Sequence, residues 1–193
     1  MTYNPDIHHR RSIRLKGYDY SSGGAYFVTI CAHGRECLFG QVVNNEMQVN
    51  DAGEMLENVW FELPGRFPNV VLDTFVVMPN HFHGIVLIVG APLAAPFFES
   101  PGVAAPFFES QYGNEGTTKR GAASSATLGE IMRAFKSISA VKVNRLLGRQ
   151  GRPLWQRNYY ERIIRNDEEL YSVREYIMCN PAKWAEDEEN PVR

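Results

Sequence analysis

The sequence contains few cysteines and no long apolar run. Its three cysteines, Cys31, Cys37 and Cys179, are an odd number without the spacing of a zinc site, which fits a reducing compartment better than a disulfide-built secreted domain. No apolar stretch is long enough to span a bilayer, and the N-terminus lacks the apolar region of a signal peptide. These absences predict a cytoplasmic protein, and 44% hydrophobic residues suffice for one sizeable core.

Histidine is also scarce, yet two of the five histidines lie one residue apart. They are His81 and His83, separated by Phe82, inside an apolar run from Phe75 to Val89. Side chains alternate across a strand, so both imidazoles project from one face while Phe82 enters the other. At that spacing the two rings can share one metal ion. The alternative is an ordinary polar pair in a sheet.

A second pattern lies near the C-terminus. Asn166 and Asp167 are helix N-cap residue types, and the helix that they predict ends before Pro181. On it, Tyr176 and Asn180 are four residues apart and share a face. Taken singly, Tyr176 fits a half-buried core tyrosine and Asn180 fits a helix C-terminal residue. Combined with the histidine pair, they would supply a nucleophile and a three-ligand metal site.

Three segments, in this order, resemble the single-tyrosine HUH transposases, and most closely their REP-associated branch. Segment 76–86, VVMPNHFHGIV, resembles the histidine–hydrophobic–histidine block of that family. Segment 154–165, LWQRNYYERIIR, resembles the block before the catalytic helix, and segment 175–183, EYIMCNPAK, resembles the helix itself. The resemblance runs from about residue 17 to residue 184, with one interruption.

The resemblance implies a DNA transposase that nicks and rejoins single-stranded DNA at hairpin or repeat-associated sites. Tyr176 matches the catalytic nucleophile, which forms a 5′-phosphotyrosine intermediate, and His81, His83 and Asn180 match the metal ligands. The implied cofactor is a divalent metal ion, Mg²⁺ or Mn²⁺. Imidazole ligands favour Mn²⁺, and the residue types leave Zn²⁺ open. The family includes monomers and homodimers that exchange catalytic helices, so the sequence leaves both possible.

The residue types suit this chemistry on general grounds. A free tyrosine has a pKa of about 10, which makes the phenol a poor nucleophile at neutral pH. A metal ion on the scissile phosphate stabilises the charge that develops during attack. A covalent intermediate divides one hard step into two and keeps the energy of the broken phosphodiester, so the strand can be rejoined without ATP.

The net charge of −2 by itself argues against a nucleic-acid partner, but the charges are segregated. Basic residues gather in an N-terminal arm, 1–24, and again between 133 and 165, whereas acidic residues gather in a tail, 185–193. We expect DNA contacts from Arg10, Arg11, Arg14, Lys16, Lys136, Arg157 and Arg165. The alternative is ordinary solvated charge. Trp155 could stack on unpaired bases or belong to the core.

Periodicity and turn signals predict an α+β fold, a ferredoxin-like antiparallel sheet with helices packed on one face. Strands are expected over 25–32, over 39–49 as two short strands joined at Asn44-Asn45, over 69–78, at the histidines, and over 159–164. Before the C-terminal helix, two others are expected. One is capped by Asn50 or Asp51 and ended by Pro64-Gly65; the other runs from Thr127 to about Leu147, with Leu128, Met132, Phe135 and Leu146 on one stripe.

One segment does not fit this core. The heptapeptide AAPFFES at 94–100 recurs at 104–110, within a low-complexity stretch from 91 to 126. It predicts a flexible insertion in an otherwise single domain spanning 1–193. The alternative is that its Phe-Phe pairs dock on a partner or on DNA.

Three other function classes compete with the transposase. A catalytically silent DNA-binding protein on the same fold would keep DNA binding in Tyr176→Phe and never cut. An RNA-binding protein on a ferredoxin-like sheet is a further possibility, although the usual aromatic strand motif is not evident. A metallohydrolase without a covalent step would tolerate Tyr176→Phe but not His81→Ala.

Overall fold

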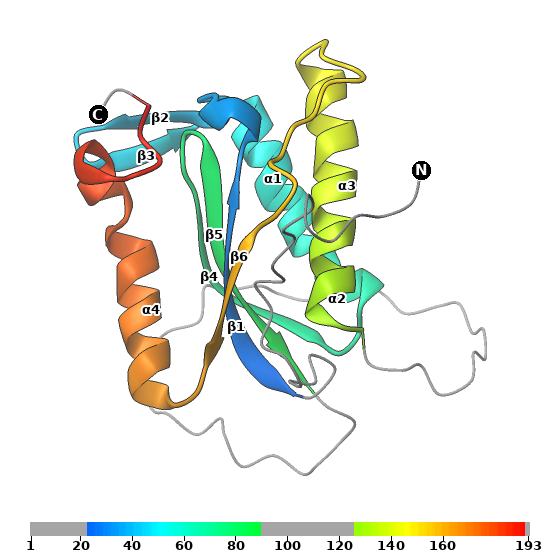
Figure 1. Cartoon of the computed structure of the whole chain (residues 1–193), viewed down its shortest axis with the longest axis vertical. Coiled ribbons are helices and arrows are strands. Elements are labelled where there is room, and N and C mark those ends of the chain that lie inside the picture. The colour runs from blue at the N-terminus through cyan, green and yellow to red at the C-terminus, as the bar shows by residue number, and fades with distance from the viewer. Residues whose placement is uncertain (1–22, 90–125, 192–193) are drawn as a thin grey trace, which may run out of the picture.

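The computed structural model describes residues 23–89 and 126–191. Strands β4, β5, β1 and β6 form one antiparallel sheet in that order, and β2 and β3 form a separate hairpin (Figure 1). The strands are β1 Gly24–Cys31, β2 Gly40–Val43, β3 Glu46–Val49, β4 Val70–Val77, β5 His81–Ile88 and β6 Tyr160–Ile164. The helices are η1 His33–Arg35, α1 Asp51–Phe61, α2 Leu63–Arg66, α3 Leu128–Leu146, α4 Asp167–Cys179 and η2 Pro181–Glu186.

Several sequence predictions concern residues outside this description. They are the basic arm with Arg10, Arg11, Arg14 and Lys16, and the duplicated heptapeptide at 94–110. Their predicted roles, and the division of the chain into one domain with an arm, an insertion and a tail, stay predictions. Among the described helices, none is both long and apolar enough to cross a membrane.

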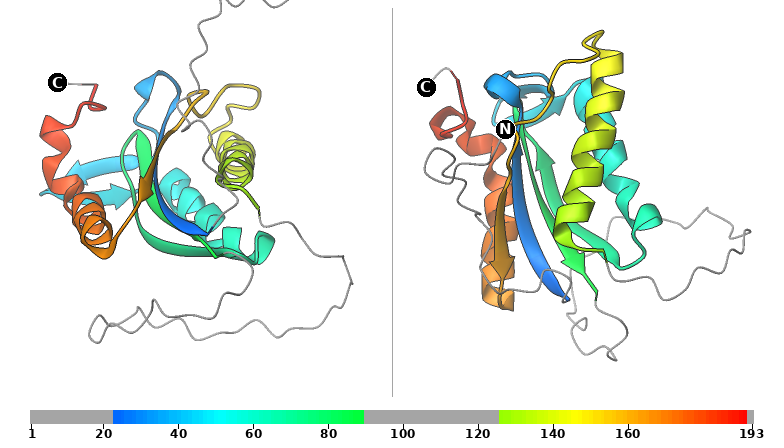
Figure 2. Two further views of the ribbon diagram at one scale, coloured as in Figure 1. Left: turned by 60° about the horizontal axis from the view of Figure 1, so that its bottom comes forward. Right: turned by 45° about the vertical axis from the view of Figure 1, so that its right-hand side comes forward.

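The sheet has the predicted ferredoxin-like arrangement. The central strands β1 and β5 pair with each other, and the edge strands β6 and β4 flank them. Helices α1 and α3 pack on one face, as expected, whereas α4 lies on the opposite face (Figure 2). The α+β prediction is therefore confirmed. The sheet separates a side covered by α1 and α3 from a side covered by α4.

The local signals that the sequence carries form the expected turns and caps. Asn44 and Asn45 both have positive φ, 53° and 67°, which joins β2 to β3 as a tight hairpin. The Asn50 side chain accepts hydrogen bonds from Ala52 N and Gly53 N, which begins α1. Thr127 and Glu130 form a reciprocal capping box at the start of α3.

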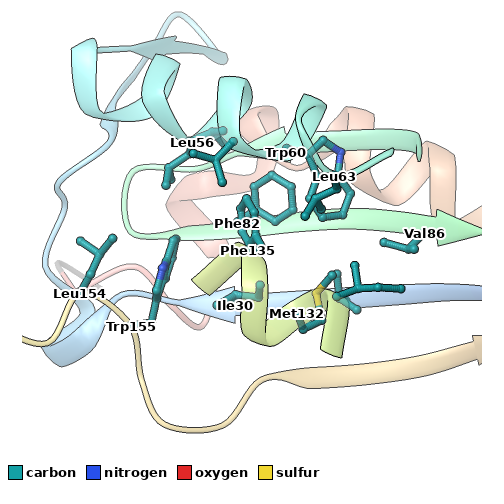
Figure 3. Packing of buried hydrophobic residues seen from close by; sticks show 14 of the residues in the cluster. Ile30, Leu56, Trp60, Leu63, Phe82, Val86, Met132, Phe135, Leu154 and Trp155 are labelled. Carbon is teal, nitrogen blue, oxygen red and sulfur yellow. The ribbon is translucent and has the colours of Figure 1, made fainter. Parts of the chain in front are cut away.

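The larger core lies between the sheet and helices α1 and α3 (Figure 3). Phe82 points into it from β5, with its ring 4.7 Å from the Trp60 ring and 5.0 Å from the Phe135 ring. Gly84 lies on the same face of β5, and a Cβ there would come within 2.8 Å of Trp60. Glycine at this position therefore lets the indole lie against the strand.

Helix α1 ends at Phe61, close to the expected end, but the structure differs from the helix predictions in one respect and adds to them in another. Pro64 and Gly65 do not end the helical path but lie inside α2, because proline is tolerated in the first turn of a helix. Leu146 shares the apolar stripe of α3 but is 45% exposed, because the last turn of that helix rises beyond the sheet (Figure 1).

Trp155, in contrast, is buried in the core, so it is not available for base stacking.

A smaller apolar cluster holds α4 on the other face. It consists of Phe27, Ile85, Ile164, Val173 and Ile177. An ion pair adds to it, because Arg174 of α4 donates to both carboxylate oxygens of Asp73 on β4, at 2.8 and 2.5 Å. The pairing of β4 with β5 shifts between Leu72 and Phe75, so Asp73 lies at this irregularity.

Candidate active site

The two histidines meet on the α4 face of the sheet, as the strand alternation predicts. His81 and His83 are fully or almost fully buried, and their Nε2 atoms are 3.0 Å apart. The outer nitrogens also have partners. His81 Nδ1 lies 2.9 Å from Asn80 Oδ1, and His83 Nδ1 lies 2.8 Å from Thr29 Oγ1. Both inner nitrogens therefore face the same small space.

Burial keeps both imidazoles neutral at physiological pH. It lowers the pKa of His81 to about 4, and the nearby Asp187 carboxylate only partly opposes this. Burial, together with the proximity of His81, also holds the pKa of His83 well below its ordinary value. Neutral imidazole is the form that binds a metal ion.

Asn180 completes this cluster from the end of α4. It is 3% exposed, and its Oδ1 is buried without a hydrogen-bond partner among the described residues. The same amide lies against both His81 and Tyr176, where it raises the pKa of the histidine and lowers that of the phenol. A buried oxygen without a partner is costly unless something else satisfies it.

Tyr176 lies beside the histidine pair. Its ring centroid is 5.3 Å from that of His83 and 5.9 Å from that of Phe27, and the side chain is 44% exposed. Burial and the Asp187 carboxylate raise its pKa, and the Asn180 amide only partly offsets them. The phenol is therefore protonated at neutral pH and still reachable from solvent.

The donor set fits a divalent metal ion. Two ligands at right angles, each about 2.1 Å from an octahedral ion, lie about 3.0 Å apart, and the two Nε2 atoms have this separation. No group of three or more His, Cys, Asp or Glu in residues 23–89 and 126–191 is placed to hold a metal ion. Two oxygen donors lie near the imidazoles: the buried Asn180 Oδ1, and Asp187 Oδ2, which is 4.0 Å from His81 Nε2.

A neighbouring thiol is not an obvious further ligand. Cys31 pairs with His81 across β1 and β5, which places it on the same face of the sheet. Burial, reinforced by the Glu189 carboxylate, raises the pKa of Cys31 to about 12. In the absence of a metal ion the Cys31 thiol is therefore protonated.

The acidic C-terminal segment, Glu186 to Glu189, is the main feature that sequence reasoning misplaced. The charge pattern predicts a tail separate from the phosphate-binding face, whereas Asp187 Oδ2 lies 4.0 Å from His81 Nε2. Arg35 fixes the segment through an ion pair to Glu189 and a hydrogen bond to the Glu188 carbonyl. The turn of η2 brings the chain back over the site, and no sequence pattern signals this return.

The predicted basic residues separate into different environments. Arg165 lines the cleft beside Tyr176, and Arg157 is exposed. Lys136 lies on α3, where its ammonium donates to the carbonyls of Gln156 and Arg157, at 2.7 and 2.9 Å. The Lys136 charge is thus engaged within the fold. Whether any of these residues contacts DNA stays a prediction.

An open cleft of about 1130 Å³ lies beside His83, Tyr176 and Asn180. It runs along β6 and α4, from His83 and Tyr176 to Arg165 and Asn166. Tyr160, at the start of β6, lies in it with 54% of its surface exposed and its ring 6.2 Å from that of Phe27. The cleft is lined by six acidic residues, Glu168, Glu169, Glu186, Asp187, Glu188 and Glu189, and by three basic ones, Arg162, Arg165 and Lys183.

Known proteins provide comparisons for this architecture. Among solved structures, that of a REP-associated tyrosine transposase bound to a REP hairpin aligns with 90% of this chain and 74% of its own, at a TM-score of 0.53 and 18% identity. A candidate transposase from Deinococcus radiodurans aligns at a TM-score of 0.45 and 13% identity, over 86% of this chain and 96% of its own.

The first of these similarities shows that the chain has a transposase-like fold. No family model matches the sequence. An uncharacterized protein from Haemophilus influenzae is 41% identical over 195 residues, and the match covers 96% of each chain. At this identity and coverage, the chain belongs to the same protein family as the Haemophilus influenzae protein.

Proposed function

We propose that this protein is a metal-dependent single-stranded DNA endonuclease and strand transferase that acts through a phosphotyrosine intermediate. One observation carries the proposal. An accessible tyrosine lies beside a pair of neutral histidines and an asparagine oxygen that has no hydrogen-bond partner. A nucleophile next to a nitrogen–oxygen metal site is an arrangement that suits phosphoryl transfer to a tyrosine.

In this proposal, His81 Nε2, His83 Nε2 and Asn180 Oδ1 hold the divalent ion. The ion supplies positive charge at the scissile phosphate and stabilises the charge that develops there. Tyr176 Oη attacks phosphorus, the phenol proton leaves to solvent, and an Oη–P bond forms. The P–O3′ bond breaks, and O3′ takes up a proton to become the free 3′-hydroxyl. Attack by a 3′-hydroxyl on the phosphotyrosine reverses these steps and rejoins the strand.

The raised pKa of Tyr176 bears on this chemistry. Burial and Asp187 favour the protonated phenol, so attack needs compensation at the site. The excess of acidic over basic residues in the cleft lining also repels phosphate oxygens. Both effects make the bound cation a requirement for binding and for chemistry, so we expect strict metal dependence.

The cleft offers contacts for an unpaired strand. Tyr160 presents an exposed aromatic face on which a base can stack, and Arg165 supplies a charge for the backbone. The transposase that shares this fold is described as bound to a REP hairpin. By analogy, we extend hairpin DNA to this chain as the proposed substrate.

The packing of α4 supports action by a single subunit. The helix packs on its own sheet through the small apolar cluster and the Arg174–Asp73 ion pair. In this arrangement Tyr176 acts together with the metal site that His81 and His83 of the same chain would form. Mixing Tyr176→Phe chains with His81→Ala chains tests this, because restored activity would require two subunits to exchange helices.

A catalytically silent DNA-binding protein is the second candidate. It is favoured by the raised pKa of Tyr176, which does not suit nucleophilic attack. It predicts hairpin binding without a covalent product under any metal condition.

The deciding experiment incubates the full chain with end-labelled single-stranded hairpin oligonucleotides and Mn²⁺ or Mg²⁺, followed by denaturing electrophoresis. We expect a metal-dependent protein–DNA adduct that disappears in Tyr176→Phe. Tyr171→Phe is the matched control, because Tyr171 lies on the same helix and is 69% exposed. Binding without an adduct, across several hairpins and both metals, would favour the silent candidate.

A further inference from the structure

Building on the proposed function, we propose that Asn80 is a positioning residue for the metal site. It holds His81 in the one tautomer whose Nε2 lone pair faces the site. Asn80 lies in the Pro79-Asn80 turn, directly before the histidine strand, and the sequence predicts no role for it beyond that turn.

The orientation of the Asn80 amide is fixed from both ends. Its side chain is 1% exposed, and Nδ2 donates to the carbonyl oxygens of Arg35 at 3.1 Å and Glu189 at 2.6 Å. Carbonyl oxygens only accept hydrogen bonds, so the NH₂ group must point toward them. The remaining amide atom, Oδ1, is therefore the atom that faces His81 Nδ1 at 2.9 Å.

This fixed amide determines the proton position on His81. Asn80 Oδ1 can only accept, so His81 Nδ1 must carry the hydrogen that bridges them. A neutral imidazole has one N–H, which leaves a lone pair on His81 Nε2. That lone pair points toward His83 Nε2, 3.0 Å away, in the space assigned to the metal ion.

His83 differs, because its outer partner is a hydroxyl. Thr29 Oγ1 can either donate to or accept from His83 Nδ1. Without a cation, His83 Nε2 can carry the hydrogen and donate it to His81 Nε2. With a cation bound, the hydrogen can lie on His83 Nδ1, with Thr29 as acceptor. Thus His81 is the fixed ligand and His83 the adjustable one.

One of the two carbonyls that orient Asn80 comes from the other end of the chain. Glu189 is 109 residues away, and Arg35 holds it through an ion pair between Nε and Oε2, at 2.9 Å. The Glu189 carbonyl therefore helps to align His81, the proposed metal ligand, by way of Asn80. Partners that orient metal-bound histidines commonly affect metal affinity about 10–100-fold.

The test compares Asn80→Ala with Asn80→Asp in the full chain. Nitrogen-15 NMR of the histidine rings in the metal-free protein reports the tautomer of His81 directly, and Mn²⁺ titration by calorimetry reports affinity without DNA. We expect Asn80→Ala to lose the pure Nδ1–H form and to bind Mn²⁺ about 10–100-fold more weakly. Asn80→Asp keeps an acceptor for Nδ1–H and should restore affinity to within a few-fold of the wild type.

A purely structural role predicts a different result. Both variants leave the Arg35 and Glu189 carbonyls without their donor, so both should unfold more easily. If stability alone mattered, Asn80→Asp would lose Mn²⁺ affinity as fully as Asn80→Ala. Asn144→Ala is the matched control, because Asn144 is another buried asparagine whose Nδ2 bonds a carbonyl, that of Arg152, on helix α3. We expect it to destabilise the fold and leave Mn²⁺ affinity unchanged.

These readouts separate this proposal from the proposed function. An unchanged His81 tautomer in Asn80→Ala, or equal loss of Mn²⁺ affinity in both Asn80 variants, overturns the role of Asn80 even if the wild type forms the DNA adduct. Conversely, the expected tautomer and affinity pattern without an adduct supports the role of Asn80 and rejects the DNA chemistry. A wild type that binds no Mn²⁺ overturns both.

Discussion

The two faces of the central sheet differ in what they bury. On the side of α1 and α3, Phe82 packs among aromatic rings, including those of Trp60 and Phe135, in the larger core. On the side of α4, an apolar cluster of five buried residues adjoins buried polar groups. These groups are Asn80, His81, His83 and Asn180.

Strand β5 contributes to both faces through its alternation. His81 and His83 point to one side, and Phe82 points to the other. The comparison indicates that the apolar face supplies most of the hydrophobic stabilisation. That stabilisation allows the second face to hold desolvated polar groups, which each cost free energy unless they are hydrogen-bonded or bind an ion.

The largest expected effect comes from neighbouring residues of β5. Phe82→Ala should lower the free energy of unfolding by about 3–5 kcal/mol, because it opens a cavity in the larger core. His83→Ala should cost roughly 1 kcal/mol through its lost hydrogen bond, but abolish tight Mn²⁺ binding. Urea denaturation and Mn²⁺ calorimetry on both variants measure this contrast. Loss of Mn²⁺ binding in a still-folded Phe82→Ala chain would contradict the division between faces.

The second prediction concerns pH. The pKa of His81 is 6.5 ordinarily and about 4 when folded, so the unfolded chain binds a proton first as pH falls. The free energy of unfolding is therefore unaffected by this histidine well above pH 6.5. It falls as the pH drops from 6.5 toward 4, by up to about 1.4 kcal/mol per pH unit for each such histidine. Urea midpoints of the metal-free protein between pH 7 and 5 measure it. His81→Gln should flatten this dependence, and an unchanged slope would contradict the assignment.

A smaller effect is expected from an ion pair on each face. Burial raises the pKa of Asp73, but hydrogen bonds from Arg174 and Thr74 outweigh it and lower the pKa overall. Arg174→Ala should therefore cost about 1 kcal/mol, a value reduced by the partial exposure of the guanidinium. Hydrogen exchange along α4 should also quicken. Lys142→Ala breaks the exposed pair with Glu62 on the opposite face and should change stability little.

The smallest predicted effect is a change in the reactivity of Tyr176. Asp187 helps to raise the pKa of this phenol, so Asp187→Asn should lower that pKa. Adduct formation should then extend to lower pH and quicken by a few-fold, as followed by denaturing gels across a pH series. Glu62→Gln makes the same charge change on the α1 side and should leave the profile unmoved. A slower reaction in Asp187→Asn would indicate that the carboxylate assists instead.

Local sequence patterns determined much of this architecture. The alternation of β5 placed both histidines on one face, Asn166 capped α4, and the four-residue spacing brought Tyr176 and Asn180 together. Each of these depends on backbone geometry within one element, which residue spacing alone specifies. Such patterns also gave the α+β class, because strand and helix signals alternate along the chain.

Tertiary structure alone decided which partners surround those residues. Thr29 and Asn80 flank the histidines, Asp187 lies 4.0 Å from His81, and Lys136 of α3 donates to the Gln156 carbonyl, in the segment before β6. These contacts join segments that are far apart in the chain, so neither periodicity nor charge counting reveals them. The sequence determined which residue types face the site. The folded chain determined their hydrogen bonds, burial and pKa values, because these depend on neighbours brought in from elsewhere.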